Sequence, residues 1–350
     1  MRILIVKLGS IGDIVHTLPA VAAIKRSLPS AHISWVAERR SAGILHGNPR
    51  IDRLIEVDTR SIRAGSIEET LRELKSQVRE LRAGKYDIAL DFQGLIKSAV
   101  VAKLSGAKRR WGFSGRALRE PASRILLTDA VRIPKQTHIV KKNLLLARAA
   151  LGVDISRKPE FPIAIDHADQ QEASSIISRL GARFTILNPG GGWPTKLWDA
   201  ANYGRLADLI WERLHMPSVI VTGPNEGSLA DKAITANKTG KLITAEPSLK
   251  GFYALAQHAA VYVGGDTGPT HIAIAAEAPI VGIFGPTEWW RNGSIDTDDI
   301  CVERNDIACR VDCHRRSCSN WICMDISVET VFDAVAKRVA VASSPNLINV

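Results

Sequence analysis

The first residues with catalytic potential lie in a loop directly after a short apolar run at the start of the chain. Arg2–Val6 is predicted to form a buried strand, and the loop that follows contains Gly9 and Gly12 and leads to Asp13. This G-x-x-G spacing differs from the G-x-G-x-x-G pattern of dinucleotide-binding folds, which disfavours a dehydrogenase. Two roles fit Asp13: its carboxylate can cap the free N–H groups of the next helix, or it can act as a general base on a hydroxyl group.

A second candidate site lies in the C-terminal half of the chain. A predicted strand ends there in two glycines, and a helix is predicted to begin near Pro269. Backbone N–H groups at the start of a helix attract phosphate oxygens. Residues suited to binding hydroxyl or phosphate groups gather at this point: Asp266, Thr267, Gly268 and His271. A purely structural turn is the alternative, but the clustering of these residue types at a strand end favours a diphosphate site.

Two further glycine-containing loops follow strands in the same half. The loop 188–198 contains Gly190, Gly191, Gly192, Thr195 and Lys196. Its glycines allow a ligand to approach the backbone, and its lysine supplies a point charge for phosphate, although a flexible loop with a solvated lysine fits the pattern too. The loop 222–226 ends in Glu226, which can hold ribose hydroxyls or simply start a helix. Three such loops in one half predict a nucleotide-diphosphate site without a Walker-type lysine motif.

All five cysteines lie between Cys301 and Cys323, so they do not form a general disulfide framework. Four of them fall within 15 residues together with His314: Cys309, Cys313, Cys318 and Cys323. These four cysteines and one histidine could serve as zinc ligands, although the paired C-x2-C spacing of most structural zinc sites is missing. Reduced thiols in a compact loop, or adventitious disulfides, are the alternatives. A structural or redox role is favoured over catalysis.

The charge of the chain is distributed unevenly. Its 350 residues include 46 basic and 36 acidic side chains, for a net charge of +10. Residues 1–160 hold 30 of the basic and 15 of the acidic residues, whereas residues 161–350 are mildly acidic. A basic half indicates an anionic partner, which can be a nucleic acid, a membrane surface or a phosphorylated substrate. The cations that we expect near an anion site are Lys7, Arg60, Arg63, Lys97, Arg109, Arg110, Arg116 and Arg119.

Apolar runs in the sequence are too short to cross a bilayer, which takes about 20 mostly apolar residues. Glu277 interrupts one candidate run, and Gln257 and His258 interrupt another. The first apolar run ends at Lys7 after four residues, so it does not resemble a signal peptide. We therefore expect a cytoplasmic protein.

Strands and helices are predicted to alternate along both halves, which is typical of a parallel sheet with helices on both faces. In the first half, strands are expected at 2–6, 33–37, 54–57 and 87–91, with helices at 13–28, 67–81 and 95–104. In the second half, strands are expected at 184–188, 218–222, 261–263 and 280–284, with helices at 199–214, 249–258 and 270–276. A polar stretch, Asp154–Pro162, is the candidate linker. An α/β protein with two doubly wound domains and a ligand cleft follows.

Several of these segments together resemble a known family. The motifs are G-D-I-V-H-T-L-P-A at 12–20, Y-D-I-A-L-D-F-Q-G-L-I-K-S-A at 86–99, R-E-P at 119–121, D-T-G-P-T-H at 266–271 and F-G-P-T at 284–287. They are similar to motifs of the ADP-heptose:lipopolysaccharide heptosyltransferases, glycosyltransferase family 9, and most similar to the type I branch. The resemblance covers about residues 1–340.

The resemblance implies a GT-B fold, with two Rossmann-like domains facing each other across a cleft. Residues 1–155 would bind the acceptor and residues 163–327 the nucleotide sugar, while a C-terminal helix near 328–342 would return to the first domain. It also implies an inverting, metal-independent and cofactor-free transfer of L-glycero-D-manno-heptose from ADP-heptose to the Kdo of lipid A. The enzyme would work at the cytoplasmic face of the inner membrane as a peripheral protein, and closure of the two domains would be needed for turnover.

The resemblance also assigns roles to individual residues. Asp13 would be the general base, and Lys196 would contact the leaving diphosphate as the second catalytic group. The donor would be bound by Gly191, Gly192, Thr195, Lys196, Glu226, Asp266, Thr267, Gly268 and His271. The acceptor would be bound by Lys7, Gly12, Arg60, Arg63, Gln93, Lys97 and Arg119.

Three alternative functions remain open at this point. The cysteine cluster resembles that of type II heptosyltransferases, which would transfer to an already heptosylated core. A sugar-nucleotide epimerase can share the same fold and would need no lipid acceptor. A basic nucleic-acid-binding protein is a third possibility, but aromatic residues make up only 5% of the chain and are not interleaved with basic ones, as stacking platforms would require.

Overall fold

The computed structural model describes residues 1–58, 67–115, 118–309, 313 and 315–343. The chain divides into two compact units, Met1–Ala164 and Ile165–Val350. The described stretch 152–166, which contains the candidate linker Asp154–Pro162, has neither helix nor strand and spans this division.

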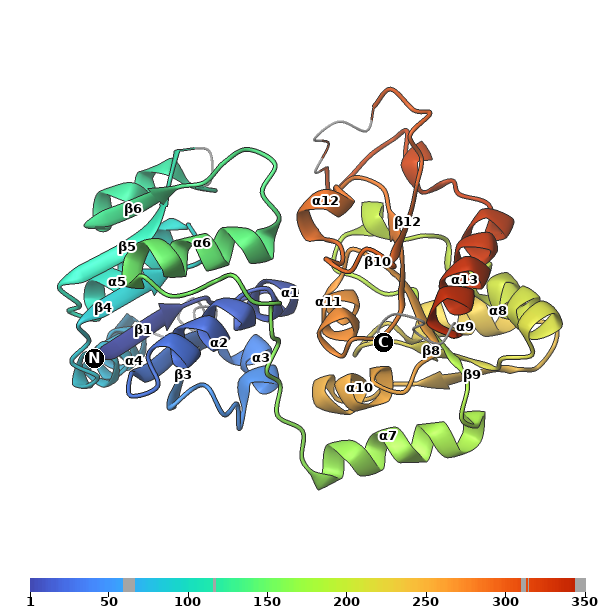
Figure 1. The fold of residues 1–350 in the computed structure, drawn as a ribbon, viewed down its shortest axis with the longest axis horizontal. Helices are drawn as coiled ribbons and strands as arrows, with labels where there is room; N and C mark the ends of the chain where they lie inside the picture. Colours follow the sequence, from blue (N-terminus) through green and yellow to red (C-terminus); the bar gives the residue numbers. More distant parts are fainter. Residues whose placement is uncertain (59–66, 116–117, 310–312, 314, 344–350) are drawn as a thin grey trace, which may run out of the picture. The chain divides into compact units, whose positions relative to one another are not determined.

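The first unit is built on a six-stranded sheet in which every pair is parallel (Figure 1). Its strands are β1 (Arg2–Val6), β2 (His32–Glu38), β3 (Arg53–Val57), β4 (Ile88–Asp91), β5 (Arg109–Ser114) and β6 (Asp129–Arg132). The spatial order is β3-β2-β1-β4-β5-β6, so the direction of winding reverses between β1 and β4. Ligands of open α/β sheets bind at the carboxyl ends of the strands at such a reversal.

Helices flank this sheet and bury their apolar residues against it. They are α1 (Ile11–Val15), α2 (Leu18–Ser27), α3 (Arg39–Ala42), η1 (Gly43–Leu45), α4 (Ile67–Ala83), α5 (Ile96–Leu104), η4 (Pro121–Leu126) and α6 (Ile139–Leu151). The single helix predicted for 13–28 is therefore two helices, with a break at His16–Thr17. Pro19 explains the break, because it has no N–H to donate to the carbonyl four residues earlier. At the break, the hydroxyl of Thr17 donates a hydrogen bond to the carbonyl of Asp13, at 2.9 Å.

The second unit repeats the same plan with six parallel strands. They are β7 (Thr185–Asn188), β8 (Ser218–Val221), β9 (Leu242–Ala245), β10 (Val261–Gly265), β11 (Ile280–Phe284) and β12 (Ile300–Glu303). The order β12-β11-β10-β7-β8-β9 places the reversal between β7 and β10. The two strands that precede the loops 188–198 and 266–271 are thus neighbours.

The helices of the second unit include a long C-terminal one. They are α7 (His167–Leu180), η5 (Pro194–Lys196), α8 (Ala200–Leu214), α9 (Gly227–Ala236), α10 (Leu249–Ala256), α11 (Gly268–Ala275), α12 (Trp289–Asn292), η6 (Ile322–Met324) and α13 (Val328–Ser343). Helix α13 packs on α8 and on β10, β11 and β12 of its own unit (Figure 1). The expected return of this helix to the first domain stays a prediction. Among the described residues, no helix has the length and apolar character needed to cross a membrane.

Candidate functional site

A buried ion pair occupies the reversal point of the first sheet. Lys7 directly follows β1 and is only 2% exposed. Its Nζ atom lies 3.1 Å from Oδ1 of Asp13 and donates to the carbonyl of Phe92 at the end of β4, at 3.0 Å. The other oxygen of Asp13 accepts the backbone N–H of Ser10 at 3.2 Å. Asp13 therefore caps the start of α1, as one of its two expected roles requires, and it is also tied to a cation.

The ionisation of Asp13 fits its second expected role. Burial raises the pKa of this carboxyl, but the charge and hydrogen bond of Lys7 and the charge of Arg119 outweigh that effect and hold the pKa below its usual value. The side chain is 25% exposed, so part of it is open to a substrate. Asp13 is thus an ionised, accessible carboxylate with a fixed orientation, which is what a general base needs before it receives a proton.

The turn after β4 holds this ion pair in place. Asp91 is fully buried and accepts the backbone N–H groups of Gln93 (2.9 Å) and Gly94 (3.2 Å) and the hydroxyl of Ser98 (3.0 Å). Gln93 in turn accepts the N–H of Leu8 through its side chain, at 3.1 Å. Burial raises the pKa of Asp91 to about 6, although these hydrogen bonds favour its charged form. Asp91 was not predicted as a site residue, because one carboxylate at the end of a strand is common.

The remaining acceptor residues predicted from the sequence lie in several places. Gly12 is buried within α1, and Gln93 touches the loop after β1. Lys97, in the first turn of α5, forms an ion pair with buried Glu38 at 3.0 Å. Arg119 is exposed. Arg60 and Arg63, and also Arg116, lie outside the described residues.

A second cluster of charges occupies the reversal point of the second sheet. Lys196 ends η5 in the loop after β7, and its Nζ atom lies 2.6 Å from Oδ2 of Asp266, which follows β10. The other oxygen of Asp266 lies 3.2 Å from Nε2 of His271. Asn292 of α12 donates to Oδ2 at 3.3 Å. The structure therefore brings three of the predicted donor residues together, and it adds Asn292, which no sequence motif indicated.

Asp266 is an anion at neutral pH. Burial opposes its ionisation, but the hydrogen bond and charge of His271 and the charge of Lys196 outweigh it and hold the pKa of Asp266 far below its usual value. This buried carboxylate, with a side chain only 4% exposed, fixes the position of both basic groups. It gathers positive charge beside the first turn of α11, where backbone N–H groups also point outward.

Hydroxyl and amide groups behind this cluster fix the start of α11. Thr267 directly precedes the helix, and its hydroxyl donates to the side chain of Asn188 at the end of β7, at 3.4 Å. Asn188 donates to the carbonyl of Val221 at 2.7 Å. Thr270 accepts from or donates to the phenol of Tyr262 at 3.0 Å. All of these groups are buried, so the polar residues of the loop are positioned by partners rather than solvated.

Close approach explains two of the glycines in the loops. A Cβ atom on Gly191 would lie 2.6 Å from the side chain of Thr267, and one on Gly190 would lie 2.1 Å from the carboxylate of Glu226. A side chain at position 191 would therefore collide with the residue that precedes α11, and one at position 190 would displace the carboxylate of Glu226. Gly192 is exposed, and a Cβ atom there would meet nothing within 4 Å.

Glu226 joins two of the glycine-containing loops. One of its oxygens accepts the N–H of Gly191 at 3.0 Å, and the other accepts the N–H of Gly223 at 2.8 Å. Glu226 directly precedes α9, but within the described residues its carboxylate caps no N–H group of that helix. The carboxylate thus holds the loops after β7 and β8 together, which neither of the two sequence-based roles anticipated.

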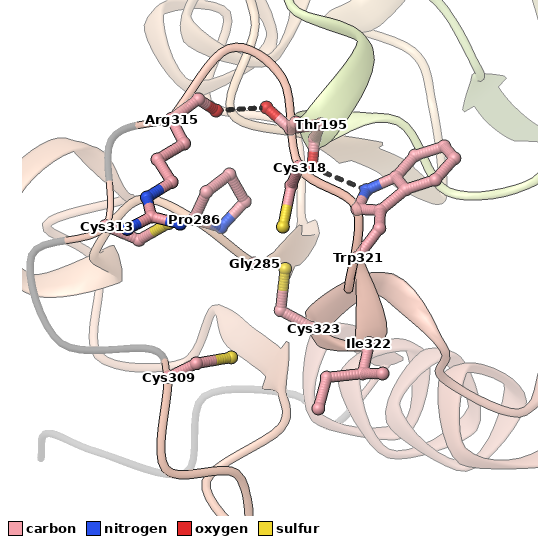
Figure 2. A pocket seen from close by; sticks show the side chains of 10 residues that line it. All are labelled: Thr195, Gly285, Pro286, Cys309, Cys313, Arg315, Cys318, Trp321, Ile322 and Cys323. Carbon is pink, nitrogen blue, oxygen red and sulfur yellow. Dashed lines mark hydrogen bonds between the residues drawn. The ribbon is translucent and has the colours of Figure 1, made fainter.

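The cysteine-containing segment lines a small pocket beside the loop 188–198 (Figure 2). Thr195 donates to the carbonyl of Arg315 at 2.6 Å, and the indole N–H of Trp321 donates to the carbonyl of Thr195 at 2.9 Å. Lys196 and Arg316 lie over the ring of Trp193, at 4.4 and 4.9 Å from its centre. The cysteine segment is therefore attached to the loop that carries Lys196.

The cysteines themselves are free thiols. Figure 2 shows the sulfur atoms of Cys309, Cys318 and Cys323 pointing into the same pocket. The backbone N–H groups that follow Cys318 lower the pKa of its thiol, whereas burial, together with the neighbouring thiols, raises the pKa of Cys323. Within the part of the chain that the structure describes, which excludes His314, no three His, Cys, Asp or Glu side chains are arranged to hold a metal ion.

Comparison with known proteins identifies the family of this chain. The sequence profile of glycosyltransferase family 9 (heptosyltransferase) matches residues 74–321. The chain belongs to this family. The predicted α/β class with two Rossmann-like units and the prediction of a glycosyltransferase are both confirmed for this family 9 enzyme.

Relatives of this family 9 glycosyltransferase cover most of its length. Lipopolysaccharide heptosyltransferase 1 of Pseudomonas aeruginosa is 28% identical over 330 residues, which is 91% of this chain and 88% of the relative. Lipopolysaccharide heptosyltransferase 1 of Escherichia coli K12 is 27% identical over 292 residues, 82% of this chain and 89% of the relative. The solved structure of Escherichia coli heptosyltransferase WaaC with ADP has a TM-score of 0.73 at 25% identity, and the match covers 86% of this chain and 92% of the other.

Proposed function

We propose that this glycosyltransferase transfers L-glycero-D-manno-heptose from ADP-heptose to the Kdo of a lipid A-linked inner core, at the cytoplasmic face of the inner membrane. The cluster of Lys196, Asp266 and His271 at the start of α11 carries the proposal, because it gathers cationic groups and helix N–H groups where a diphosphate would bind. The relatives named lipopolysaccharide heptosyltransferase 1, and the structure of one heptosyltransferase with ADP, support this donor and this acceptor.

In this proposal, Asp13 activates the acceptor. Its carboxylate takes the proton of the attacking Kdo hydroxyl, while the oxygen of that hydroxyl bonds to the anomeric carbon of heptose and the bond from that carbon to the phosphate oxygen of ADP breaks. A single displacement of this kind inverts the configuration at the anomeric carbon. Lys7 keeps Asp13 ionised and oriented through its 3.1 Å ion pair. The cations Lys97, Arg60, Arg63 and Arg119 would bind the negative charges of the acceptor together with Gly12 and Gln93.

Charge on the leaving ADP is stabilised by the protein without a metal ion in this proposal. Lys196 would share its positive charge between Asp266 and the diphosphate, His271 would bind the donor beside it, and the N–H groups at the start of α11 would bind the diphosphate oxygens. The backbone of Gly191, Gly192 and Gly268 and the hydroxyls of Thr195 and Thr267 would complete the donor site. Removal of one such stabilising group costs about 10²–10³-fold in turnover in other enzymes.

Glu226 can serve the donor while it holds the loops. Each carboxylate oxygen has two lone pairs, and each oxygen of Glu226 accepts one N–H bond from a loop glycine. Within the described residues, the second lone pair on each oxygen is available to a ribose hydroxyl. Ribose recognition and loop positioning are therefore compatible roles for this side chain.

The decisive experiment uses ADP-heptose with a panel of Kdo-lipid A and heptosylated acceptors, and detects products by mass spectrometry. Heptose added to Kdo-lipid A supports the proposal, whereas addition only to the heptosylated acceptor would assign the type II reaction. A changed nucleotide sugar without any acceptor would indicate an epimerase. Asp13→Ala should abolish transfer and keep ADP affinity, and unchanged turnover would refute the role of Asp13 as base.

A further inference from the structure

Three large aliphatic side chains are exposed on neighbouring elements of the first unit. Ile96 and Val100 on α5 are 44% and 38% exposed, and Ile125 on η4 is 84% exposed. Helix α5, labelled in Figure 1, and η4 contact each other. Aliphatic residues normally leave water on folding, so three of them on two packed elements indicate a surface that is covered by a partner.

The local structure holds these side chains outward. Ala99 and Ala102 bury the opposite side of α5, and Ile96 and Val100 are four residues apart, which places them on one face of the helix. The carboxylate of Glu120, the residue before η4, accepts the backbone N–H of Ile96 at 2.7 Å. This bond fixes η4 beside the start of α5. We name the surface formed by α5 and η4 the α5–η4 face.

Basic residues are frequent in the segment of the chain that forms this face. Between residues 92 and 128 the chain has eight basic side chains and a single acidic one, Glu120. Those that the structure shows as exposed are Lys97, Lys103, Lys108, Arg109 and Arg119. Aliphatic tips beside a surplus of lysine and arginine are typical of protein surfaces that lie on anionic lipid, because the apolar groups enter the head-group region while the cations bind lipid phosphates.

The α5–η4 face is continuous with the proposed acceptor site. Lys97 lies in the first turn of α5, and its ammonium group is paired with Glu38, whose N–H bonds to the carbonyl of Leu8 at 2.8 Å. The N–H of Glu120 bonds to the carbonyl of Gly94, in the turn next to Gln93. A lipid surface beneath this face would therefore lie next to the residues that would bind a lipid-anchored sugar.

We infer that the α5–η4 face docks this protein on an anionic lipid bilayer, with Ile96, Val100 and Ile125 inserted among the head groups. This inference rests on the proposed function for its biological meaning, because it presents the acceptor site to a sugar that is anchored in the same bilayer. Charge and apolar exposure together favour lipid over a soluble protein partner.

The test is cosedimentation with vesicles of phosphatidylcholine alone and of phosphatidylcholine with phosphatidylglycerol. The protein should bind the anionic vesicles and remain in solution with the neutral ones. The double variant Ile96→Asn/Ile125→Asn should reduce the bound fraction at least about fivefold, and Lys103→Gln/Lys108→Gln should reduce it by a similar factor. Ile234→Asn on α9 of the second unit is the matched control, because Ile234 is 40% exposed and should not affect binding.

Activity assays separate this inference from the proposed function. With a deacylated, water-soluble acceptor, both double variants should match the unaltered protein, whereas with the acceptor embedded in anionic vesicles they should be slower. Equal sedimentation of unaltered protein and Ile96→Asn/Ile125→Asn would overturn the inference, as would equal binding to neutral and anionic vesicles. A change from dimer to monomer in these variants, without any vesicle binding, would assign the face to a second copy of the chain. If the unaltered protein transferred heptose to none of the acceptors, the proposed function would be refuted, whereas the result of the vesicle experiment would still stand.

Discussion

The ammonium group of Lys196 lies 2.6 Å from the buried carboxylate of Asp266, although 70 residues separate them in the sequence. The pair forms because β7 and β10 are neighbours at the point where the order of strands reverses. Asp266 also contacts His271, so a single carboxylate positions two basic groups. The arrangement places positive charge at the start of α11 before any anion binds.

Lys196→Ala should slow transfer far more than it weakens the fold. The change removes the cation proposed for the leaving diphosphate, and we expect kcat to fall about 10²–10³-fold. It also leaves Asp266 with His271 and Asn292 as partners, so part of its stabilisation is kept. Steady-state kinetics with ADP-heptose measures the effect, and Lys232→Ala, on the exposed surface of α9, is the control. An unchanged kcat would remove Lys196 from the mechanism.

Stability should rise on mild acidification because of Asp91. Its pKa is raised from 3.8 to about 6 in the folded chain, so the folded state binds a proton more tightly than the unfolded state does. The charged form therefore costs stability above pH 6, and the cost is relieved as the pH falls. From pH 7.5 to pH 5 we expect a gain of about 1 kcal/mol in the free energy of unfolding from this residue.

Urea unfolding of the unaltered protein and of Asp91→Asn, at both pH values, isolates this contribution. The difference in free energy of unfolding between the two proteins should change by that amount, because every other carboxyl is common to both. A difference that does not depend on pH would show that Asp91 is ionised at pH 5 in the folded chain. Asp91→Asn should also disturb the turn at Gln93 and Gly94, whose N–H groups it holds.

The alternation of strands and helices was predictable because it depends on local apolar runs. The strands that were not predicted lie toward the edges of the two sheets: β5, β6, β9 and β12. In β9, one residue of four is buried, and β5 begins with the charged Arg109 and Arg110. Edge strands are covered on fewer sides, so they need no continuous apolar run and give little periodic signal.

The site was predictable loop by loop but not contact by contact. Residue types and spacing identified the loops that carry Asp13, Lys196 and Asp266. The ion pairs within them depend on which strands are neighbours, and the sequence alone does not specify that order. Asn292 and Asp91 were missed because their importance comes only from the groups that the fold places beside them. The bond from Glu226 to Gly191 likewise spans 35 residues and two loops.

Glu226→Ala should weaken ADP binding by loosening two loops at once. The variant leaves the N–H groups of Gly191 and Gly223 without their acceptors, and each lost hydrogen bond is worth about 1 kcal/mol. We expect ADP affinity to fall at least about tenfold. Glu226→Gln keeps one acceptor oxygen and should lose less. Calorimetric titration with ADP measures both variants beside Glu212→Ala, an exposed change on α8, and equal affinities would show that the loops hold their positions without Glu226.

Chemical modification of the cysteine pocket should affect donor binding through the loop 188–198. N-ethylmaleimide should label Cys318 faster than Cys323, because backbone N–H groups stabilise the Cys318 thiolate whereas burial disfavours that of Cys323. An added group at Cys318 would displace Trp321, whose indole N–H holds the carbonyl of Thr195 beside Lys196. Peptide mass spectrometry gives the order of labelling, and ADP titration of the labelled protein gives its effect.

Trp321→Phe tests the same connection without a reagent. It removes a single hydrogen bond to Thr195 and should raise the KM for ADP-heptose about fivefold, since such a bond is worth about 1 kcal/mol. Trp211→Phe is the matched control. The ring of Trp211 on α8 is partly exposed, and this change should leave KM unchanged. If Trp321→Phe and labelled Cys318 both left donor binding intact, the cysteine pocket would be structurally attached to the loop 188–198 and functionally separate from it.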